Sequence, residues 1–449
     1  MELIKGHIEN NQEKYIDVLF KLLKQPSISS QNIGMEECAK LLVTIMEDAG
    51  IKSNMIETKG HPIVYGEIIN PENEFTILFY GHYDVQPPDP YEKWISYPFE
   101  PEIRNGKIYA RGAGDNKGQL LAHILAIKSI LEIYGKLPIN VKLIFDGEEE
   151  NLSENFAPFV EEHRDLLQAD LVYTADGPLH NSGLPIITLG CRGMLYIELT
   201  AKGANKDHHS GNKGGIVPNP AWQLIHALTT MYSSNGEVLI EGFYDDVKSP
   251  TKYEQELLQS LPFSAQEIAS LLGIKTLDLD GYSYYNRLTF QPTFNISGLT
   301  SGYGGEGSKT IIPSVAKVKL DLRLAADQDP DDIYHKIENH IKKNQLQVEM
   351  VCHGKVKPSR TSPDNHLVQK VIGSVEKIHQ KKPLIIPAIG ATYPDYVFTQ
   401  ILGLPSILVP YANADEDNHS PNENLDISCF TNGIKTSSQV ILDLGNKQP

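Results

Sequence analysis

The sequence predicts an α/β protein with two domains: a discontinuous domain on a mixed, mostly parallel sheet covered by helices, and a smaller α+β domain inserted into it. The chain has 449 residues, which is more than one hydrophobic core usually serves. Helix-like and strand-like segments alternate in its first part, and strands with one polar face occupy its middle. The pattern of a buried strand returns near the end, at residues 405–410.

Helices and strands alternate in the first part of the chain. Apolar residues at helical spacing predict helices around residues 16–23, 41–46 and 120–131. Short apolar runs, each bounded by glycine or acidic residues, predict three buried strands, at 75–80, 141–145 and 171–173. Because strands separated by helices pair in parallel, we expect a sheet that helices cover on both faces.

The middle of the chain follows a different pattern. Residues 314–324 alternate apolar with polar side chains, which predicts a strand with one buried face. A helix with acids at its start and lysines at its end is expected at 331–343, and a second alternating strand at 346–352. With a strand at 195–201 and a helix after Asn219, these elements predict a split β-α-β unit of ferredoxin-like type.

The domain boundaries follow from this change of pattern. We expect residues 1–194 and 383–449 to form the discontinuous α/β domain, because buried-strand character returns after residue 382. Residues 195–382 then form the inserted domain.

Composition excludes two classes of partner. The chain has 40 Lys and Arg against 57 Asp and Glu, a net charge of −17, and such a field repels nucleic acid and anionic membranes. No segment approaches the ~18 apolar residues of a membrane span. The four cysteines are scattered, and the charged start of the chain lacks the apolar core of a signal peptide. These features predict a cytoplasmic protein.

Acidic residues and a histidine follow the predicted strands. They lie at four places along the chain: His82 with Asp84, Asp115, Glu148–Glu149–Glu150, and Asp176. Ligands of open α/β sheets bind outside the carboxyl ends of the strands, so we expect these loops to converge. Crowded carboxylates repel one another unless cations neutralise them, and an added imidazole suits zinc or a similar divalent ion.

Each segment alone has a simpler interpretation. His82 and Asp84 can form a hydrogen-bonded turn, and the three glutamates a solvated surface turn. Asp115 can cap the helix that follows it. The glycines of residues 112–118 match neither common phosphate-binding spacing. The conjunction of the four segments is what favours a metal site.

These residues resemble the dinuclear zinc exopeptidases and deacylases of aminoacylase, carboxypeptidase G and carnosine dipeptidase type, most closely the carnosinase-like dipeptidases. The matching motifs run in order along nearly the whole chain: Gly-His-x-Asp-Val at 81–85, Gly-Ala-x-Asp-x-Lys-Gly at 112–118, the paired glutamates, Asp176, and His-Ser-x-Asn-Glu at 419–423. The resemblance implies one ion on His82, Asp115 and Asp176. It implies a second ion on Asp115, Glu150 and His419, with Asp115 bridging. Zinc is the expected metal, with manganese and cobalt as alternatives.

The resemblance also implies catalytic roles. Glu149 is the general base that moves a proton from the attacking water to the leaving amine. Asp84 accepts a hydrogen bond from the far nitrogen of His82. A cis peptide is expected at Asp115–Asn116. The register of the glutamates stays open, since the pair is either 149/150 or 148/149.

Four residues outside the metal motifs are implied to contact substrate. His209 stabilises the oxyanion and reaches the active site of a partner subunit in the dimeric relatives, which implies a homodimer through the inserted lid domain. Thr310 supplies a substrate contact, and Arg323 binds the substrate carboxylate. Thr392 belongs to a carboxylate-binding loop at residues 390–392.

The sequence thus favours a metallopeptidase that cleaves dipeptides or short peptides with a free C-terminal carboxylate. Two alternatives remain: an N-acyl-amino-acid deacylase with the same mechanism, and a non-catalytic binding protein on the same fold. A substrate panel distinguishes the deacylase from the metallopeptidase, because their substrates differ only in the group on the amino-terminal side of the scissile amide bond. The presence of Glu149 argues against the second, because a binding protein needs no base.

Overall fold

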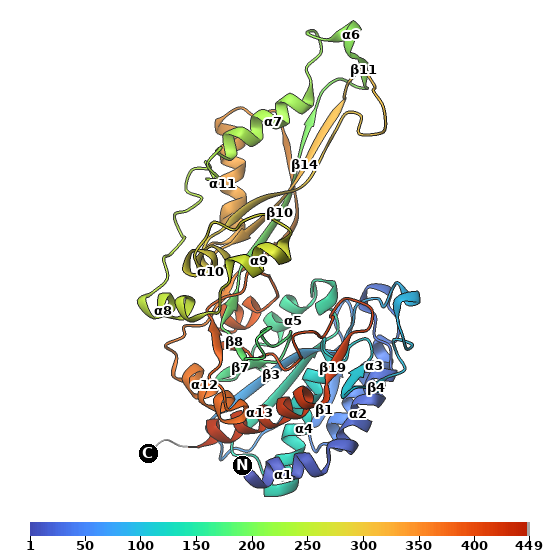
Figure 1. The fold of residues 1–449 in the computed structure, drawn as a ribbon, viewed down its shortest axis with the longest axis vertical. Coiled ribbons are helices and arrows are strands. Elements are labelled where there is room, and N and C mark those ends of the chain that lie inside the picture. Colours follow the sequence, from blue (N-terminus) through green and yellow to red (C-terminus); the bar gives the residue numbers. More distant parts are fainter. Residues whose placement is uncertain (447–449) are drawn as a thin grey trace. The chain divides into compact units, whose positions relative to one another are not determined.

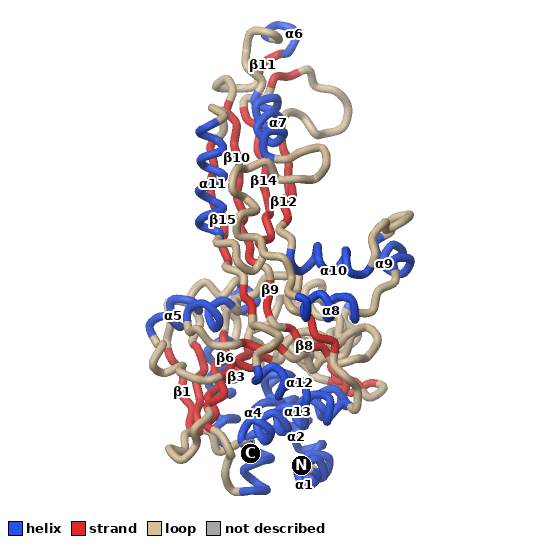
Figure 2. The backbone as a smooth tube through the Cα atoms, turned by 90° about the vertical axis from the view of Figure 1, so that its left-hand side faces the viewer, coloured by secondary structure: helices blue, strands red, loops and turns tan. Residues whose placement is uncertain are grey.

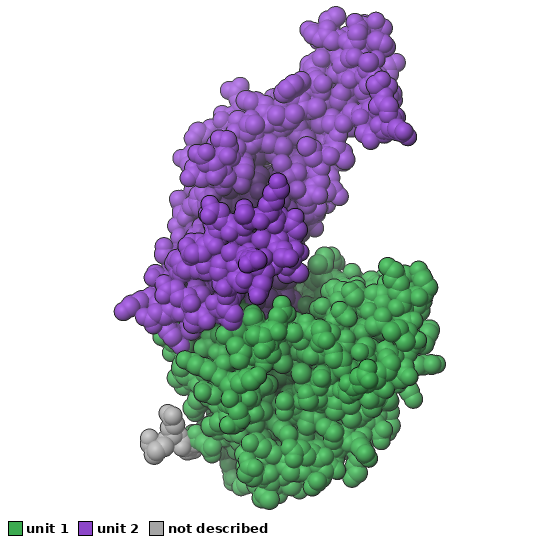
Figure 3. All heavy atoms as spheres, viewed as in Figure 1, with its two compact units in different colours: residues 1–190, 360–387, 397–449 green, residues 191–359, 388–396 purple. Residues whose placement is uncertain are grey.

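A computed structural model describes residues 1–446 (Figure 1), and Figure 2 shows its helices, strands and loops. Residues 447–449, the last of the segment expected at 383–449, lie outside the described part. The chain forms two compact units (Figure 3). Unit 1 comprises Met1–Gly190, Arg360–Pro387 and Val397–Pro449, and unit 2 comprises Cys191–Ser359 and Ala388–Tyr396.

The division differs from the expected one on the C-terminal side of the insertion. Residues 360–382 belong to unit 1, because helix α12 (His366–His379) packs on the last helix, α13 (Ile427–Gly445), where Asp443 accepts hydrogen bonds from Ser374 and Lys377. A short later segment, Ala388–Tyr396, belongs to unit 2, where Arg192 N donates to Ile389 O.

Unit 1 is built on an eight-stranded sheet with the order β1-β2-β6-β3-β7-β18-β8-β17. Its strands are β1 (Lys52–Ile56), β2 (Ile63–Ile68), β3 (Thr76–His82), β6 (Asn140–Asp146), β7 (Leu171–Thr174), β8 (Ile186–Thr188), β17 (Leu384–Ile386) and β18 (Ser406–Leu408). The central strands β6, β3, β7 and β18 pair in parallel, and β17 pairs in parallel with β8. Strands β1 and β2 and the β18–β8 pair are antiparallel. The prediction of a mixed, mostly parallel sheet is confirmed.

Helices cover both faces of this sheet. Neighbouring residues of a strand point to opposite faces, and two neighbouring residues of β3 contact two different helices. The ring of Phe79 in β3 lies 4.5 Å from that of His123 in α4 (Lys117–Tyr134). The ring of the next residue, Tyr80, lies 5.3 Å from that of Phe156 in α5 (Phe156–Glu162). The α4 side carries further helices: α1 (Glu2–Asn10), α2 (Gln12–Lys24) and α13. Helix α3 (Met35–Asp48) packs on β1 and β2.

A small three-stranded sheet of unit 1 holds two loops together. Its order is β19-β5-β4, with β4 (Glu102–Arg104), β5 (Lys107–Tyr109) and β19 (Asn424–Asp426). Strand β19 pairs antiparallel with β5. The loop that ends at Glu423 therefore lies beside the loop that starts at Ala110, where Ala110 N donates to Glu423 O.

Unit 2 is a ferredoxin-like α+β unit (Figure 2). Its antiparallel sheet has the order β12-β14-β10-β15, with β10 (Gly193–Lys202), β12 (Thr293–Ser301), β14 (Val315–Leu324) and β15 (Glu349–Val356). Helices α7 (Pro220–Met231) and α11 (Pro330–Lys343) pack on one face, over a core that includes Leu195, Ile197 and Leu199 of β10. The sequence predicted both helices and three of these strands.

The rest of unit 2 consists of short elements. A two-stranded ribbon of β11 (His208–His209) and β13 (Ile311–Ile312) lies with α6 (Ser210–Lys213) at one end of the four-stranded sheet (Figure 1). Helices α8 (Lys252–Ser260), α9 (Ala265–Leu272) and α10 (Gly281–Phe290) precede β12. Within residues 1–446, no helix has the length and apolar character needed to cross a membrane.

Candidate metal centre

The carboxyl ends of three parallel strands bring the predicted residues together. Strand β3 pairs in parallel with both β6 and β7, with His82 opposite Asp146 and Tyr80 opposite Thr174. The loops after these strands therefore leave the sheet at the same edge, as expected. The small β19-β5-β4 sheet adds the loops that carry Asp115 and His419.

The first group of possible ligands is His82, Asp115 and Asp176, whose ligand atoms lie within 4.8 Å of one another. Nε2 of His82 is 3.0 Å from Asp115 Oδ1 and 3.9 Å from Asp176 Oδ2. This nitrogen is buried and makes no hydrogen bond with the described residues. A buried imidazole nitrogen that faces two carboxylates without a hydrogen bond suits a metal ligand.

The second group is Asp115, Glu150 and His419, again within 4.8 Å of one another. Nε2 of His419 is 3.2 Å from Asp115 Oδ2 and 3.0 Å from Glu150 Oε2. Asp115 thus belongs to both groups and turns one oxygen towards each histidine. Two imidazoles and three carboxylates are a donor set that zinc, manganese and cobalt accept. The expected cis peptide at Asp115–Asn116 is present.

Asp84 lies behind His82 and is fully buried. Nδ1 of His82 is 3.1 Å from the main-chain oxygen of Asp84 and 3.3 Å from its carboxylate Oδ1. The Asp84 carboxylate also accepts hydrogen bonds from the main-chain nitrogens of Glu149, at 3.2 Å, and Glu150, at 3.1 Å. Asp84 therefore fixes the far side of the imidazole and the glutamate turn together.

The three consecutive glutamates point to different partners. Glu148 accepts hydrogen bonds from His61 N and from Asn155, so it lies apart from both ligand groups. Oε2 of Glu149 is 3.9 Å from His82 Nε2. Glu150 belongs to the second ligand group. This arrangement favours the 149/150 register over 148/149.

The electrostatics of the cluster reflect crowded negative charge. Burial raises the pKa of Glu149 well above its usual value, and neighbouring carboxylates raise it further while His82 opposes them. Burial and the charge of Asp115 raise the pKa of Asp176 to about 6. Hydrogen bonds to Asp115 and Glu150 raise the pKa of His419 to about 10. The raised pKa values show that proton binding is favoured where the carboxylates are crowded together. Bound divalent cations would relieve the same repulsion between the carboxylates.

Glu423 has a role that the sequence analysis did not assign. Its buried carboxylate accepts hydrogen bonds from the main-chain nitrogens of Gly112, Gly114 and Asp115, each at 3.0 Å. It also accepts one from Arg111 Nη1 at 2.7 Å. Glu423 therefore holds the loop that presents Asp115. The sequence offered one indication of this role: the glycine-rich loop at residues 112–118 has main-chain N–H groups that need a hydrogen-bond acceptor.

Three further residues near the centre were also missed. Gln86 Nε2 donates to Glu150 Oε2 at 2.9 Å, and Asn116 Nδ2 donates to Asp176 Oδ1 at 2.8 Å. Glu416 is buried, and neither of its carboxylate oxygens forms a hydrogen bond within residues 1–446. These positions depend on segments far apart in the sequence, so no local pattern predicts them.

In unit 2, Arg323 and Thr392 are hydrogen-bonded to each other. Arg323 Nη1 donates to Thr392 Oγ1 at 2.8 Å, and its Nε lies 3.3 Å from Asp321 Oδ1. Thr392 Oγ1 in turn donates to the main-chain oxygen of Arg192 at 2.8 Å. The structure thus joins two of the four residues that were expected to contact substrate.

His209 and Thr310 lie elsewhere in unit 2. His209 is the second residue of β11 and pairs with Ile311 of β13, and Thr310 directly precedes β13, where Ser210 N donates to Thr310 O at 3.0 Å. His209 is exposed, and its Nδ1 accepts a hydrogen bond from Gly211 N at 3.0 Å. Thr310 precedes the ten-residue strand β14, and Arg323 lies near the far end of that strand. The length of the strand separates the two residues by ~30 Å at the usual rise per residue.

The sequence profile of peptidase family M20/M25/M40 matches residues 78–443. The chain is 27% identical to Cys-Gly metallodipeptidase dug1 of Schizosaccharomyces pombe, over 98% of either chain. Among solved structures, the M20 family metallo-carboxypeptidase Sso-CP2 of Sulfolobus solfataricus is 39% identical, with a TM-score of 0.87 over 95% of this chain and 98% of that one. Human carnosine dipeptidase 1 is 25% identical, with a TM-score of 0.75 over 99% of both chains.

These matches agree with the geometry of the site. The family profile spans every residue of the two ligand groups, and the relatives named above are metallopeptidases or dipeptidases. The chain therefore belongs to peptidase family M20/M25/M40 and is a metallopeptidase.

Proposed function

We propose that this metallopeptidase hydrolyses dipeptides or short peptides that end in a free carboxylate, with two divalent ions and Glu149 as general base. One observation carries the proposal: the two carboxylate oxygens of Asp115 face two histidines, His82 in the first ligand group and His419 in the second. The relatives support the substrate class, since their names include a Cys-Gly metallodipeptidase, a carnosine dipeptidase and a metallo-carboxypeptidase.

The proposed ligands are those of the two groups, with Asp115 shared. Zinc is the first candidate, with manganese and cobalt as alternatives. Two such ions, when bound, supply Lewis-acid activation of a water and of the scissile carbonyl. Glu149 takes the proton of the attacking water and delivers it to the leaving amine. Asp84 keeps His82 and the glutamate turn in place during this transfer.

In unit 2, Arg323 is proposed to bind the terminal carboxylate of the substrate through its guanidinium group. Thr392 supports the orientation of Arg323 through their hydrogen bond. His209 and Thr310 are proposed to serve the active site of a second copy in a homodimer. The length of β14 supports this, because it separates Thr310 from Arg323 within one chain.

A substrate panel tests the proposed reaction. Dipeptides, their C-terminal amides and N-acyl amino acids are assayed with protein loaded with zinc, manganese or cobalt. We expect cleavage of the dipeptides and much weaker cleavage of their amides. Cleavage of N-acyl amino acids alone would replace the proposal with a deacylase. If metal-loaded protein cleaves none of these amides, the proposed substrate class is wrong.

Mixing two variants tests the role of His209 across a dimer. His209→Gln and Glu149→Gln are each expected to be nearly inactive alone. After subunits exchange, a mixed dimer contains one site with an intact Glu149 and an intact His209 from the partner. Recovery of activity on mixing is the expected result. A His209→Gln variant that stays active as a monomer would contradict it.

A further inference from the structure

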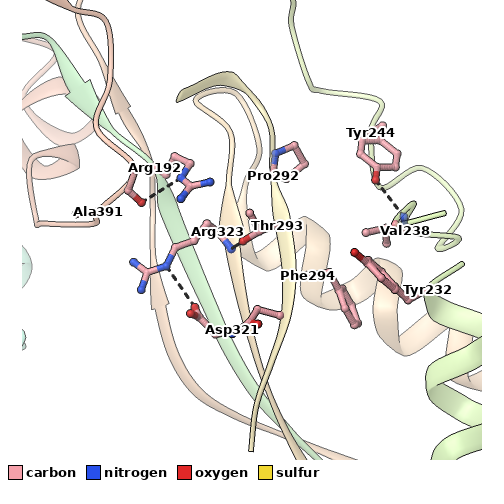
Figure 4. Close-up of a pocket in the computed structure, with 13 residues that line it drawn as sticks. Arg192, Tyr232, Val238, Tyr244, Pro292, Thr293, Phe294, Asp321, Arg323 and Ala391 are labelled. Carbon is pink, nitrogen blue, oxygen red and sulfur yellow. Dashed lines mark hydrogen bonds and ion pairs between the residues drawn. The ribbon is translucent and has the colours of Figure 1, made fainter. Parts of the chain in front are cut away.

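A cavity within unit 2 is lined by a second guanidinium group, that of Arg192, in addition to that of Arg323. The cavity has a volume of about 580 Å³. It is lined by Arg192 just before β10, the start of β12, the end of β14, the segment at 390–391 and residues of the segment 232–244 (Figure 4). Arg192 and Arg323 both line it, together with Asp321. The proposed reaction gives a role to Arg323 and none to Arg192.

The side chain of Arg192 has only neutral hydrogen-bond partners. Its Nε donates to Gly390 O at 3.0 Å and its Nη1 to Gln291 O at 3.3 Å. Arg192 is 7% exposed, and in the part of the chain from residue 1 to residue 446 it forms no ion pair. A buried cation without a counter-ion is costly, so an arrangement of this kind favours an anionic ligand.

The charges around the cavity leave an excess of one positive charge. Arg323 is paired with Asp321, with Nε 3.3 Å from Oδ1. The charged groups that act on Arg192 are these two residues, so two cations face one anion. Burial and the charge of Arg323 lower the pKa of Arg192 to about 10, and it therefore stays charged at neutral pH. One carboxylate group would neutralise the excess.

Arg192 also holds the loop beside Arg323. Its guanidinium binds Gly390 O, and its main-chain oxygen accepts the hydrogen bond of Thr392 Oγ1 at 2.8 Å. Thr392 Oγ1 is also the acceptor for Arg323 Nη1. A Cβ atom at Gly390 would lie 3.1 Å from Arg192 Nη2, so the loop approaches the guanidinium closely. Arg192 is thus placed to act on any anion that Arg323 binds.

We propose that Arg192 is a specificity-determining residue that, together with Arg323, makes this cavity a site for a single carboxylate group. Arg192 then imposes the preference for substrates with a free C-terminal carboxylate over those with a neutral terminus. The inference rests on the proposed function, because it assigns the carboxylate to the substrate of that reaction.

A binding measurement on the full-length, metal-loaded protein tests this role. Isothermal titration compares 3-phenylpropionate with 3-phenylpropionamide, two ligands that differ in charge and contain no peptide bond. The variants are Arg192→Gln, Arg192→Lys and, as a matched control, Arg287→Gln, an exposed arginine of α10 that does not line the cavity. Asp321→Asn serves as a gain-of-charge variant that does not remove Arg192.

The unaltered protein is expected to bind the carboxylate at least about tenfold more tightly than the amide. Arg192→Gln should lose about tenfold in affinity for the carboxylate and little for the amide, and Arg192→Lys should retain part of the preference. Asp321→Asn should bind the carboxylate more tightly, and Arg287→Gln should match the unaltered protein. An equal loss for both ligands would indicate a purely structural role and overturn the proposal, as would an unchanged preference or no binding of either ligand.

The proposed function is tested separately by peptide hydrolysis. If no peptide is cleaved but the carboxylate preference depends on Arg192, the reaction is wrong and the anion site stands. If peptides are cleaved and the preference does not depend on Arg192, the reaction stands and the role of Arg192 is wrong.

Discussion

The two units treat charged side chains in different ways. In unit 1 three charged groups around the candidate metal centre are removed from water, since His82 is 1% exposed and Asp84 and Glu423 are 0% exposed; the side chain of His419, in contrast, is 55% exposed. On the sheet of unit 2 the pair of Lys202 and Glu349 is open to solvent, since both side chains are 63% exposed. The cavity at Arg192 is the exception in unit 2.

This difference determines how each unit tolerates change. A buried charge is stable only with its partners in place, so removing one partner is expensive. An exposed ion pair gains little over solvation by water. Substitutions of the buried charges in unit 1 should therefore have large effects on metal binding and stability, and substitutions of exposed ion pairs on the sheet of unit 2 should have small ones.

The largest effect is expected at Asp115. Asp115→Asn removes the carboxylate common to both ligand groups, and kcat/KM should fall at least about a thousandfold, with loss of bound metal. Metal analysis after dialysis and peptide hydrolysis measure the two effects. Asp165→Asn, at an exposed acid of unit 1, is the control. Full metal content and activity in Asp115→Asn would show that the two groups are not the metal centre.

Glu423→Gln should give the next largest effect. The change leaves Arg111, which is 1% exposed, without its ionic partner, and the free energy of unfolding should fall by about 3–5 kcal/mol. Urea denaturation measures the change. A loss below about 1 kcal/mol would mean that this ion pair does not hold the Asp115 loop.

His123 should contribute a pH dependence to the stability of unit 1. Burial lowers the pKa of His123 to about 3, whereas the unfolded chain has the ordinary value of about 6.5. Below pH 6.5 the unfolded state therefore binds a proton that the folded state does not, and stability falls as the pH falls towards 3. At pH 5 this contribution is about 2 kcal/mol.

The variant His123→Gln isolates that contribution. Its free energy of unfolding should depend less steeply on pH between about 6.5 and 5 than that of the unaltered protein, when both are measured by urea denaturation. Parallel curves for the two proteins would contradict the assignment to His123.

The smallest effect is expected in unit 2, at Glu349. Glu349→Gln breaks the exposed pair with Lys202 by the same chemical change as Glu423→Gln. The midpoint temperature of unfolding should move by no more than about 2 °C. A loss of unfolding free energy as large as the loss of about 3–5 kcal/mol expected for Glu423→Gln, measured in the same way by urea denaturation, would remove the contrast between the two units.

The sequence predicted the parts of the structure that local patterns determine. Apolar runs identified β3, β6 and β7, and the residues after them, with the family resemblance, identified both ligand groups. It did not predict the return of residues 360–382 to unit 1, which depends on the packing of α12 against α13. The position of Glu423 and the proposed role of Arg192 were also missed, because each depends on partners distant in the sequence.

The central claim is that two ions held by unit 1 and the base Glu149 hydrolyse a peptide bond. The most direct measurement compares peptide hydrolysis and bound metal in chelated protein, in protein reloaded with zinc, manganese or cobalt, and in Glu149→Gln. The account predicts activity that chelation removes and reloading restores, and a Glu149→Gln variant that keeps two metals but loses activity. Hydrolysis that survives complete chelation, or an active Glu149→Gln variant, would contradict it.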